Sequence, residues 1–227
     1  MVHLSLVSHS IGSLPPRRQA RLRRWIEQVA ALLTLFAMSV PMFLVAGALG
    51  LTLGSPLLFR QTRIGLNVKT FTIVKFRTMT DSRDASGTLL SDEQRLSPFT
   101  RFIRRTRLDE LPQLLAILSG DMSFIGPRPL LPSTILAMDE LGHLRCAVRP
   151  GLSGCAQVNG NTQLSDRQKL ALDIWYVDHK SNRLDLLIVI RTLDTLLRGE
   201  RLGLSPLQRA EAHMAACYPQ FSPGPCP

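Results

Sequence analysis

The chain contains 227 residues, with 27 lysines and arginines against 17 aspartates and glutamates, which gives a formal net charge of +10. This length suits one domain of ordinary size, and the positive charge favours anionic partners such as membranes, nucleotides or nucleic acid. The four cysteines show no CxxC spacing, which argues against a disulfide framework or a zinc site and favours a reducing setting.

The chain begins with a basic segment, residues 1–24. Residues 1–16 are weakly patterned, and we expect them to be disordered. A run rich in arginine follows and ends at Trp25. Tryptophan beside basic residues is typical of a membrane interface, so this run is predicted to anchor the segment that follows it.

Residues 25–54 are predicted to form a kinked, re-entrant membrane helix. The stretch Val29–Leu53 carries no charge and is long enough for a membrane segment. Basic residues lie on both sides of it, and a helix that crossed the membrane would place one basic group outside, against the positive-inside tendency. Pro41 removes a backbone hydrogen bond inside the stretch and bends or breaks the helix. A spanning helix and a signal peptide are the alternatives.

Two short strands are predicted at residues 57–63 and 70–78, around a turn at 65–67. The second strand leads into the sequence KFRTM, which carries Lys75 and Arg77. These two cations belong either to a solvated strand or to the substrate side of a site. The sequence favours neither interpretation over the other.

A helix is predicted to start at Ser97 and to end at Arg105. Ser97 is a favourable N-cap, and Pro98 suits the first helical position. Phe99 and Phe102 form an apolar side, opposite a side rich in arginine. Such a helix can pack on the protein or lie in a membrane interface.

The residues most suited to chemistry lie between Arg101 and Pro129. The adjacent acids Asp109 and Glu110 follow a cluster of arginines and precede Arg128. Pro112 is tolerated in the first turn of a helix, so Asp109 is predicted to lie near a helix N-terminus. There the helix dipole and the arginines would lower the pKa of its carboxyl group and attract phosphate.

Two carboxylates between clusters of cations indicate a site for a phosphate-bearing substrate and a metal. Oxygen ligands from Asp109 and Glu110 suit Mg²⁺, or Mn²⁺, which also binds substrate phosphates. A carboxylate can instead attack phosphorus directly. The residues alone do not decide between a metal ligand and a nucleophile, and two adjacent acids can also be plain surface charge.

The rest of the chain alternates helices with a glycine-rich loop. Helices are predicted from apolar spacing at 133–145, 166–179 and 183–199. A glycine-rich loop separates the first two of these helices, and the leucine-rich start of the third is assigned to the core rather than to the membrane. Residues 204–227 are predicted to form a partly ordered tail.

Several sequence blocks occur in an order that resembles the bacterial sugar transferase family, the small monotopic phosphoglycosyl transferases. They are KFRTM (75–79), LDELPQL (108–114), GDMSFIGPRPL (120–130), RPGLSGCAQVNG (149–160) and LDIWYV (172–177). The resemblance runs from about residue 23 to about residue 203. It implies an α/β fold, mainly helical, with a re-entrant membrane helix, interfacial amphipathic helices and a small strand element. Residues 55–203 would form the catalytic domain.

The resemblance also implies a reaction. A sugar-1-phosphate passes from a UDP-sugar to a polyprenyl phosphate, such as undecaprenyl phosphate, and UMP is released. The reaction takes place at the cytoplasmic face of the bacterial inner membrane, as the first membrane step in making an exopolysaccharide, lipopolysaccharide or capsule. Later glycosyltransferases of the same pathway are possible partners.

The family's site residues map onto this sequence one by one. Asp109 corresponds to a covalent nucleophile, and Glu110 to its partner acid or metal ligand. Arg104 and Arg128 correspond to phosphate-binding residues, and Asp185 to a further polar group at the phosphate site, with a helix N-cap as its alternative role. The chain departs from the family where an arginine usually follows the last glycine of the RPGLSGCAQVNG block, because Asn161 stands there.

Two other classes of function are compatible with the same residues. A membrane-bound phosphatase or nucleotidyl-type enzyme could use the same carboxylates and would release inorganic phosphate rather than UMP. A non-catalytic, basic adaptor for a membrane surface would bind in a salt-sensitive way and show no turnover. Nucleic acid is not expected as a partner, because few aromatic side chains lie near the arginines to stack on bases.

Overall fold

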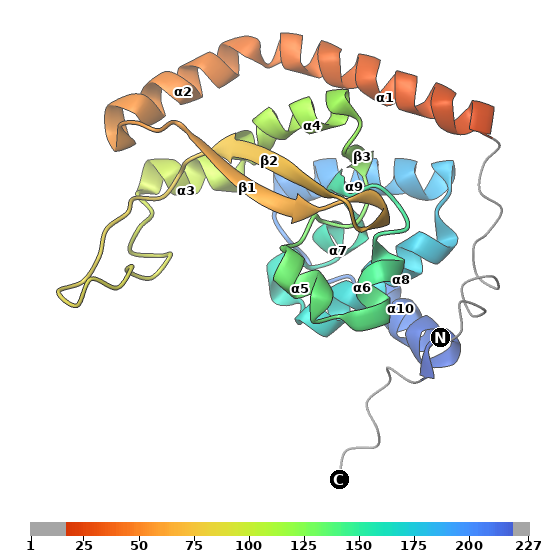
Figure 1. Ribbon diagram of the computed structural model, residues 1–227. Coiled ribbons are helices and arrows are strands. Elements are labelled where there is room, and N and C mark those ends of the chain that lie inside the picture. Colours follow the sequence, from red (N-terminus) through yellow and green to blue (C-terminus); the bar gives the residue numbers. More distant parts are fainter. Residues whose placement is uncertain (1–16, 220–227) are drawn as a thin grey trace.

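The computed structural model describes residues 17–219. The disorder expected for residues 1–16, and the end of the predicted tail from residue 220 onward, therefore lie outside the described part of the chain. In Figure 1, two long helices lie along the top of the molecule, a strand hairpin lies beneath them, and the C-terminal helix lies at the bottom.

The N-terminal helices are α1 (Arg17–Ala37) and α2 (Ser39–Leu53), and their axes differ by 58°. The break falls at Met38, just before Pro41, whose missing N–H leaves the carbonyl of Ala37 without its usual helical partner. The predicted kink is thus confirmed. Between residues 17 and 219 no single helix is long and apolar enough to cross a membrane, whereas this bent pair passes that test when its two halves are taken together.

The hairpin consists of β1 (Leu58–Ile64) and β2 (Thr70–Phe76), joined by a short 3-10 turn, η1 (Leu66–Val68). The strands are antiparallel and pair Arg63 with Phe71 and Phe59 with Lys75. Directly paired residues lie on the same face of a sheet, and so do residues two apart on one strand. Arg63 and Lys75 therefore share a face, and the two predicted strands are confirmed.

The segment that carries the acid pair follows α3 (Pro98–Arg105), whose Ser97 cap forms a capping box with Thr100 as its partner. The acid pair lies on a 3-10 helix, η2 (Leu108–Gln113), which runs directly into α4 (Leu114–Ser119). Gly120 then ends the helix with a φ of 84°. The predicted N-cap at Ser97 is confirmed, and Asp109 lies in the first turn of a helix as predicted, although this helix is of the 3-10 type.

Two glycine-containing blocks meet backbone to backbone. Strands β3 (Ser123–Ile125) and β4 (Gly151–Ser153) pair in parallel. A Cβ added at Gly126 would lie 2.2 Å from the carbonyl oxygen of Arg149, closer than any side chain can be tolerated. The predicted loop at 149–160 is wrong in part, because it contains β4 and a short helix, α7 (Cys155–Val158), before the 3-10 turn η3 (Asn161–Gln163).

The helix predicted at 133–145 is in fact two helices, α5 (Pro132–Leu136) and α6 (Asp139–Arg145). The chain turns sharply between them, and Asp139 adopts a left-handed φ of 48°. The close approach of Gly142 to the carbonyl oxygen of Ile135 holds the two helices together, since a Cβ there would lie 2.3 Å from that oxygen. Apolar spacing alone did not reveal this break.

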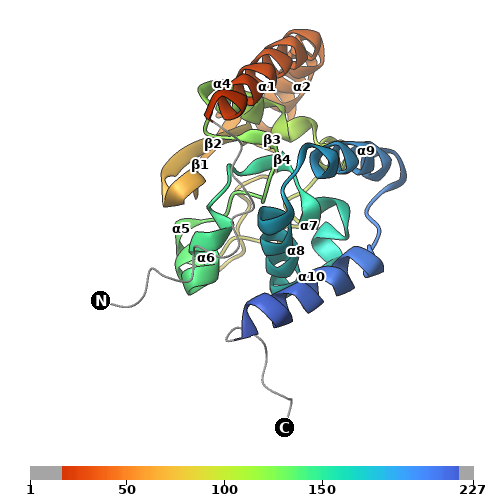
Figure 2. The same cartoon turned by 90° about the vertical axis from the view of Figure 1, so that its right-hand side faces the viewer.

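Helix α8 (Asp166–His179) has the predicted bounds and is the centre of the largest core cluster, to which it contributes the fully buried Leu172, Ile174 and Tyr176. Helix α10 (Leu204–Cys217) packs across it, as Figure 2 shows. The predicted tail is thus helical over this part of the chain, where Leu207, Ala210 and Met214 are buried at helical spacing.

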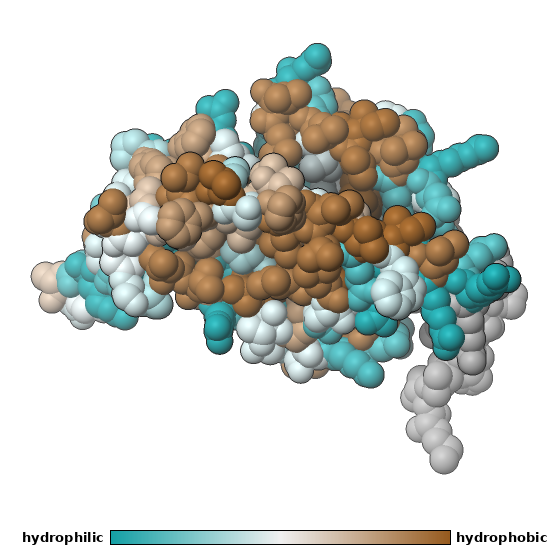
Figure 3. Space-filling view, turned by 90° about the horizontal axis from the view of Figure 1, so that it is seen from above, coloured by the Kyte–Doolittle hydropathy of each residue, from teal (hydrophilic) through white to brown (hydrophobic). Residues whose placement is uncertain are grey.

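Helix α9 (Asn182–Arg198) begins and ends close to the predicted bounds, but its leucine-rich half is not in the core. Leu186 is 61% exposed and Ile190 is 55% exposed, whereas Ile188 is buried. The core assignment of this stretch was wrong. Exposed apolar side chains also follow α1 and α2, and Figure 3 shows how they gather on the face of the molecule that carries these two helices.

Candidate functional site

The acid pair lies on η2, in a short segment that is fixed at both ends. Arg107 adopts a left-handed conformation, with φ 58°, and turns the chain from the end of α3 into η2. η2 packs against β2 and leads into α4, in which Leu114, Ala116 and Ile117 are buried. Asp109 and Glu110 are thereby held in a buried position, with exposed fractions of 6% and 8%.

Glu110 is neutralised by two arginines, one on each carboxylate oxygen. Arg128 Nη2 donates to Oε1 at 2.7 Å, and Arg107 Nη1 lies 3.5 Å from Oε2. Burial opposes ionisation of Glu110, but the charges of Arg128 and Arg107 outweigh it and lower the pKa of the carboxyl group. Glu110 is therefore a fixed anion that holds two cations beside Asp109.

Asp109 is in a different electrostatic position from its neighbour. It forms no salt bridge with any residue from 17 to 219. Burial raises the pKa of its carboxyl group, the negative charge of Glu110 raises it further, and the charges of Lys75 and Arg104 offset only part of the rise. The predicted lowering of this pKa was wrong, because desolvation of Asp109 and the adjacent Glu110 carboxylate outweigh the nearby cations.

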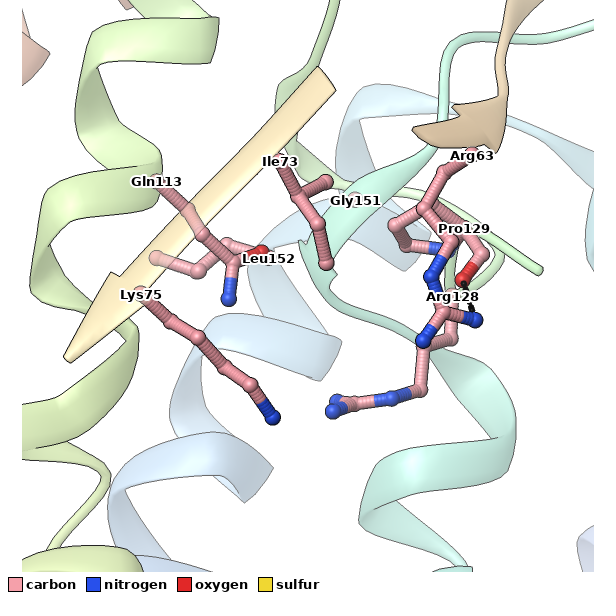
Figure 4. Close-up of a pocket in the computed structure, with 8 residues that line it drawn as sticks. All are labelled: Arg63, Ile73, Lys75, Gln113, Arg128, Pro129, Gly151 and Leu152. Atoms are coloured by element: carbon pink, nitrogen blue, oxygen red, sulfur yellow. Dashed lines mark hydrogen bonds between the residues drawn. The ribbon is translucent and has the colours of Figure 1, made fainter. Parts of the chain in front are cut away.

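A small pocket, partly lined by Lys75 and Arg128, lies beside the acid pair. Lys75 and Arg128 extend toward one another from two of its walls (Figure 4). Burial lowers the pKa of Lys75, although the charge of Asp109 acts in the opposite direction. Lys75 was left undecided in the sequence analysis, and the structure places it next to Asp109. The alternation of β2 could have supported this, since Lys75 shares a face with the buried Ile73.

Arg104 and Arg128 both lie within electrostatic reach of Asp109, so the structure brings these predicted site residues together. Asp185 has other partners. It accepts a hydrogen bond from Tyr176 at 2.7 Å and pairs with Arg23 of α1. Its alternative role as an N-cap was wrong, because Ser181 caps α9. Asp185 ties α1 to α8 and α9, and its role in phosphate binding stays a prediction.

A second, fully buried ion pair, Arg145 with Asp173, fixes the backbone of Arg128. Arg145 Nε donates to Asp173 Oδ2 at 2.7 Å, and both side chains are 4% exposed. Arg145 also donates through Nη2 to the backbone carbonyl of Arg128. The pair joins α6 to α8 and fixes the backbone from which Arg128 reaches Glu110.

Comparison with known proteins shows which family combines these features. The sequence model of the family described as bacterial sugar transferase matches residues 18–199, which is most of the chain. The chain belongs to the bacterial sugar transferase family. It is accordingly an enzyme, a phosphoglycosyl transferase.

Named relatives of this sugar transferase include EpsL of Bacillus subtilis, which is 45% identical over 179 residues, 79% of this chain and 89% of EpsL. A UDP-glucose:undecaprenyl-phosphate glucose-1-phosphate transferase of Caulobacter vibrioides is 39% identical over 202 residues, 82% of this chain and 74% of the relative. The exopolysaccharide production protein ExoY of Sinorhizobium fredii is 32% identical over 188 residues, 75% and 83% of the two chains.

The sugar transferase also has a third carboxylate at the site, which the sequence analysis missed. Glu200 lies just beyond the matched residues, and Arg107 Nη2 lies 3.5 Å from its Oε1. Its side chain accepts hydrogen bonds from the Asn161 amide and from the backbone N–H of Thr162. Asn161, which replaces the family's usual arginine, thus helps Glu200 to hold the turn at 160–163 next to Arg107.

The oxygen donors at this site suit a metal ion that is held partly by the protein and partly by the phosphates of a substrate. No group of three or more His, Cys, Asp or Glu side chains within residues 17–219 could hold a metal ion by itself. Mg²⁺ commonly binds through one or two carboxylates together with substrate phosphates. Asp109 fits that pattern, whereas both oxygens of Glu110 already contact arginines.

Proposed function

We propose that this sugar transferase moves a sugar-1-phosphate from a UDP-sugar to a polyprenyl phosphate, such as undecaprenyl phosphate, and releases UMP. The observation that carries the proposal is the contrast within the acid pair. Glu110 is held by two arginines, while Asp109 is buried beside them without a salt bridge of its own among residues 17–219. The relatives whose names specify undecaprenyl-phosphate transferases support the same reaction.

The first step is an attack by Asp109 on the donor. A carboxylate oxygen of Asp109 forms a bond to the β-phosphorus of the UDP-sugar, and the bond from this phosphorus to the bridging oxygen breaks. The electron pair leaves with UMP, and the sugar phosphate remains as an acyl phosphate on Asp109. A raised pKa makes the Asp109 anion a better nucleophile than an ordinary aspartate, provided that it is deprotonated.

In the second step, an oxygen of the lipid phosphate attacks the same phosphorus. The bond between this phosphorus and the Asp109 oxygen breaks, which restores the carboxylate and yields the polyprenyl-diphosphate sugar. Both steps bring anions together, so they depend on positioning and on charge neutralisation. Arg128, Lys75 and Arg104 supply positive charge around Asp109 for this purpose.

Magnesium or manganese is the proposed cofactor, with Asp109 and Glu110 as its protein ligands. When bound, such an ion neutralises charge on the diphosphate. Both oxygens of Glu110 contact arginines, whereas no arginine pairs with Asp109 among residues 17–219, so Asp109 is the ligand whose oxygens have less competition. Full turnover in an excess of chelator would disprove a metal requirement.

The bent helix pair is the proposed membrane anchor. It enters from the cytoplasmic side and returns to the same side, with Trp25 at the interface and the exposed leucines of α9 resting on the membrane surface. Labels attached before α1 and after Gly203 should then be accessible from the same side of the inner membrane. Labels found on opposite sides would show that the pair spans the membrane.

We place the reaction at the first membrane step of a bacterial surface polysaccharide. Relatives are named exopolysaccharide production proteins and a galactosyl transferase, CpsE. Enzymes that add further sugars to the lipid-linked product would act next.

The decisive experiment mixes the purified enzyme with a panel of UDP-sugars and undecaprenyl phosphate and measures UMP. One donor should support UMP release that depends on the enzyme. Without the lipid, mass spectrometry of the intact protein should show the added mass of one sugar phosphate, mapped to Asp109 and lost when the lipid is supplied. Release of inorganic phosphate in place of UMP would favour a phosphatase and contradict the proposal.

A further inference from the structure

The pocket beside the acid pair is lined by cations and by no acid. Three basic side chains contribute to its wall, and the other residues that line it are uncharged. The basic residues are Arg63, Lys75 and Arg128. Cations that converge on one space repel each other, and a bound anion removes that repulsion. The composition of the wall therefore indicates a ligand with negative charge.

Arg63 and Lys75 both lack a salt bridge among residues 17–219, whereas Arg128 is paired with Glu110. The charges of Asp109 and Glu110 act on Lys75, but Arg63 is influenced by the cation Arg128. Arg63 Nη1 donates to the carbonyl of Pro129 at 3.3 Å, drawn as a dashed line in Figure 4, and its Nη2 donates to Gln61 at 2.6 Å. Its Nε is buried and has no hydrogen-bond partner among residues 17–219.

Such an arrangement is costly in the absence of a ligand. Burial lowers the pKa of Arg63, and the neighbouring charge of Arg128 lowers it further. A buried donor without an acceptor carries the full cost of its lost hydration. Arginine in a position of this kind is suited to phosphate, which its planar group of donors binds through more than one hydrogen bond.

The hairpin explains why Arg63 and Lys75 meet at one pocket. Their pairing with Phe71 and Phe59 puts both side chains on the same face of the two strands. Lys75 is also within electrostatic reach of Asp109, so the Lys75 side of the pocket lies near the acid pair, and Arg63 lines the pocket farther along the hairpin. A ligand group held at Arg63 would lie to one side of the reacting phosphorus.

We propose that Arg63, together with Lys75 and Arg128, forms a second phosphate subsite next to the attacked phosphorus. The inference rests on the proposed function, in which the donor brings two phosphates and the lipid brings a third. Only the transferred phosphate bonds to Asp109. The subsite would hold either the nucleotide phosphate of the donor or the phosphate monoester of the lipid, and these two groups share the same chemistry.

The test compares Arg63→Gln with Arg60→Gln in the full-length enzyme. Arg60 is on the same strand and loses the same charge, but it is exposed and points to the other face of the hairpin. The two half-reactions are measured separately, as adduct formation from the UDP-sugar and as discharge of the preformed adduct by polyprenyl phosphate. Binding of UMP and of polyprenyl phosphate in detergent micelles is measured by calorimetry, which does not depend on turnover.

We expect Arg63→Gln to raise the KM of one half-reaction about 10- to 100-fold, which is the range for a lost hydrogen bond to a charged group. The matching ligand, UMP or the lipid phosphate, should bind more weakly by the same factor. A change for UMP assigns the subsite to the donor, and a change for the lipid assigns it to the acceptor. Arg63→Lys should recover part of the loss, because it restores the charge.

Two results would overturn the subsite. One is an Arg63→Gln enzyme that matches Arg60→Gln in both half-reactions and in both binding titrations. The other is an equal fall in the rates of both half-reactions, together with a lower unfolding temperature and no recovery in Arg63→Lys. Arg63 would then serve only to hold the backbone at Pro129. If the wild-type enzyme binds UMP through Arg63 but releases no UMP from any donor, the proposed function fails while the subsite stands.

Discussion

The molecule contains two buried ion clusters that differ in their charge balance. At the candidate active site, the carboxylates of Asp109 and Glu110 lie among more cations than they can neutralise. In the pair below it, Arg145 faces Asp173 alone, and the two side chains are equally buried. Both clusters are held by packed helices, so burial alone does not separate a catalytic cluster from a structural one.

The difference shows what each cluster requires from outside the chain. A one-to-one pair is balanced in charge and serves to hold α6 against α8, although Asp173 Oδ1 has no hydrogen-bond partner among residues 17–219. At the acid pair, the excess positive charge is neutralised only when an anionic ligand binds. Substitutions in the first cluster should therefore alter catalysis more than stability, and substitutions in the second should alter stability more than catalysis.

The largest effect is expected for Asp109→Asn. Asparagine has nearly the same shape as aspartate but is a far poorer nucleophile, so turnover should fall by at least about four orders of magnitude. The unfolding temperature should stay the same or rise, because the change removes a buried carboxylate that forms no salt bridge within residues 17–219. Steady-state UMP release and thermal unfolding measure the two quantities.

The matched comparison for this variant is Glu110→Gln. Glutamine leaves Arg128 without its anion and removes one of the two anions beside Arg107, so this variant should lose stability as well as activity. Retention of normal turnover by Asp109→Asn, with no adduct detectable in the wild-type enzyme, would make Asp109 a ligand or a structural group instead of a nucleophile.

The buried pair should show the opposite behaviour. Asp173→Ala leaves Arg145 as an uncompensated buried charge and should reduce the free energy of unfolding by about 3–5 kcal/mol. Denaturant titration measures this value. The control is Asp166→Ala, which removes an exposed partner of Lys169 on the same helix and should change stability by only a few tenths of a kcal/mol. Similar losses in both variants would refute the structural role of the buried pair.

The sequence predicted those parts of the fold that depend on local signals. The bounds of α8 were correct because Ser165 and Gln168 form a capping box at its start. The hairpin was correct because its apolar residues alternate around a turn. The acid pair and Arg128 were also predicted to lie together, and the structure joins Arg128 to Glu110 directly.

The errors concern features that depend on distant parts of the chain. Glu200 and Asn161 are 39 residues apart, so no local pattern links them. The leucines of α9 and those of a core helix have the same spacing, and only the packed structure shows that Leu186 has no protein neighbour to cover it. The raised pKa of Asp109 reflects its burial where η2 packs against β2, and the number of nearby arginines in the sequence does not reveal this burial.

A smaller effect than those above is expected for Arg128→Ala. Arg128 binds Glu110 and faces the pocket, so its loss should raise the barrier of the phosphoryl-transfer step by about 2–4 kcal/mol. Measurement of kcat/KM for UMP release gives the value. Arg105→Ala is the control, because Arg105 is exposed at the end of α3 and forms no salt bridge in the described structure. An Arg128→Ala enzyme with wild-type kcat/KM would remove Arg128 from the site.

The smallest effect concerns the pH profile, and it tests the contrast between paired and unpaired charge most directly. Asp109 must be deprotonated to attack, and its pKa is raised, so the acidic limb of kcat/KM should lie at a higher pH than for an ordinary aspartate. Burial lowers the pKa of Lys75, so the basic limb should lie below the ordinary value for a lysine if the charge of Lys75 is required.

Substitution of Lys75 separates the two limbs. Lys75→Arg keeps a charge that does not titrate in the accessible range, so the basic limb should move to higher pH while the acidic limb stays in place. Lys75→Gln removes a charge that favours the Asp109 anion, so the pKa of Asp109 should rise and the acidic limb should move to higher pH. Arg104, Arg128 and Glu110 act on the same carboxylate and remain unchanged in both variants. An acidic limb that stays in place in Lys75→Gln would show that another group controls it, and that Lys75 and Asp109 are not coupled in the working enzyme.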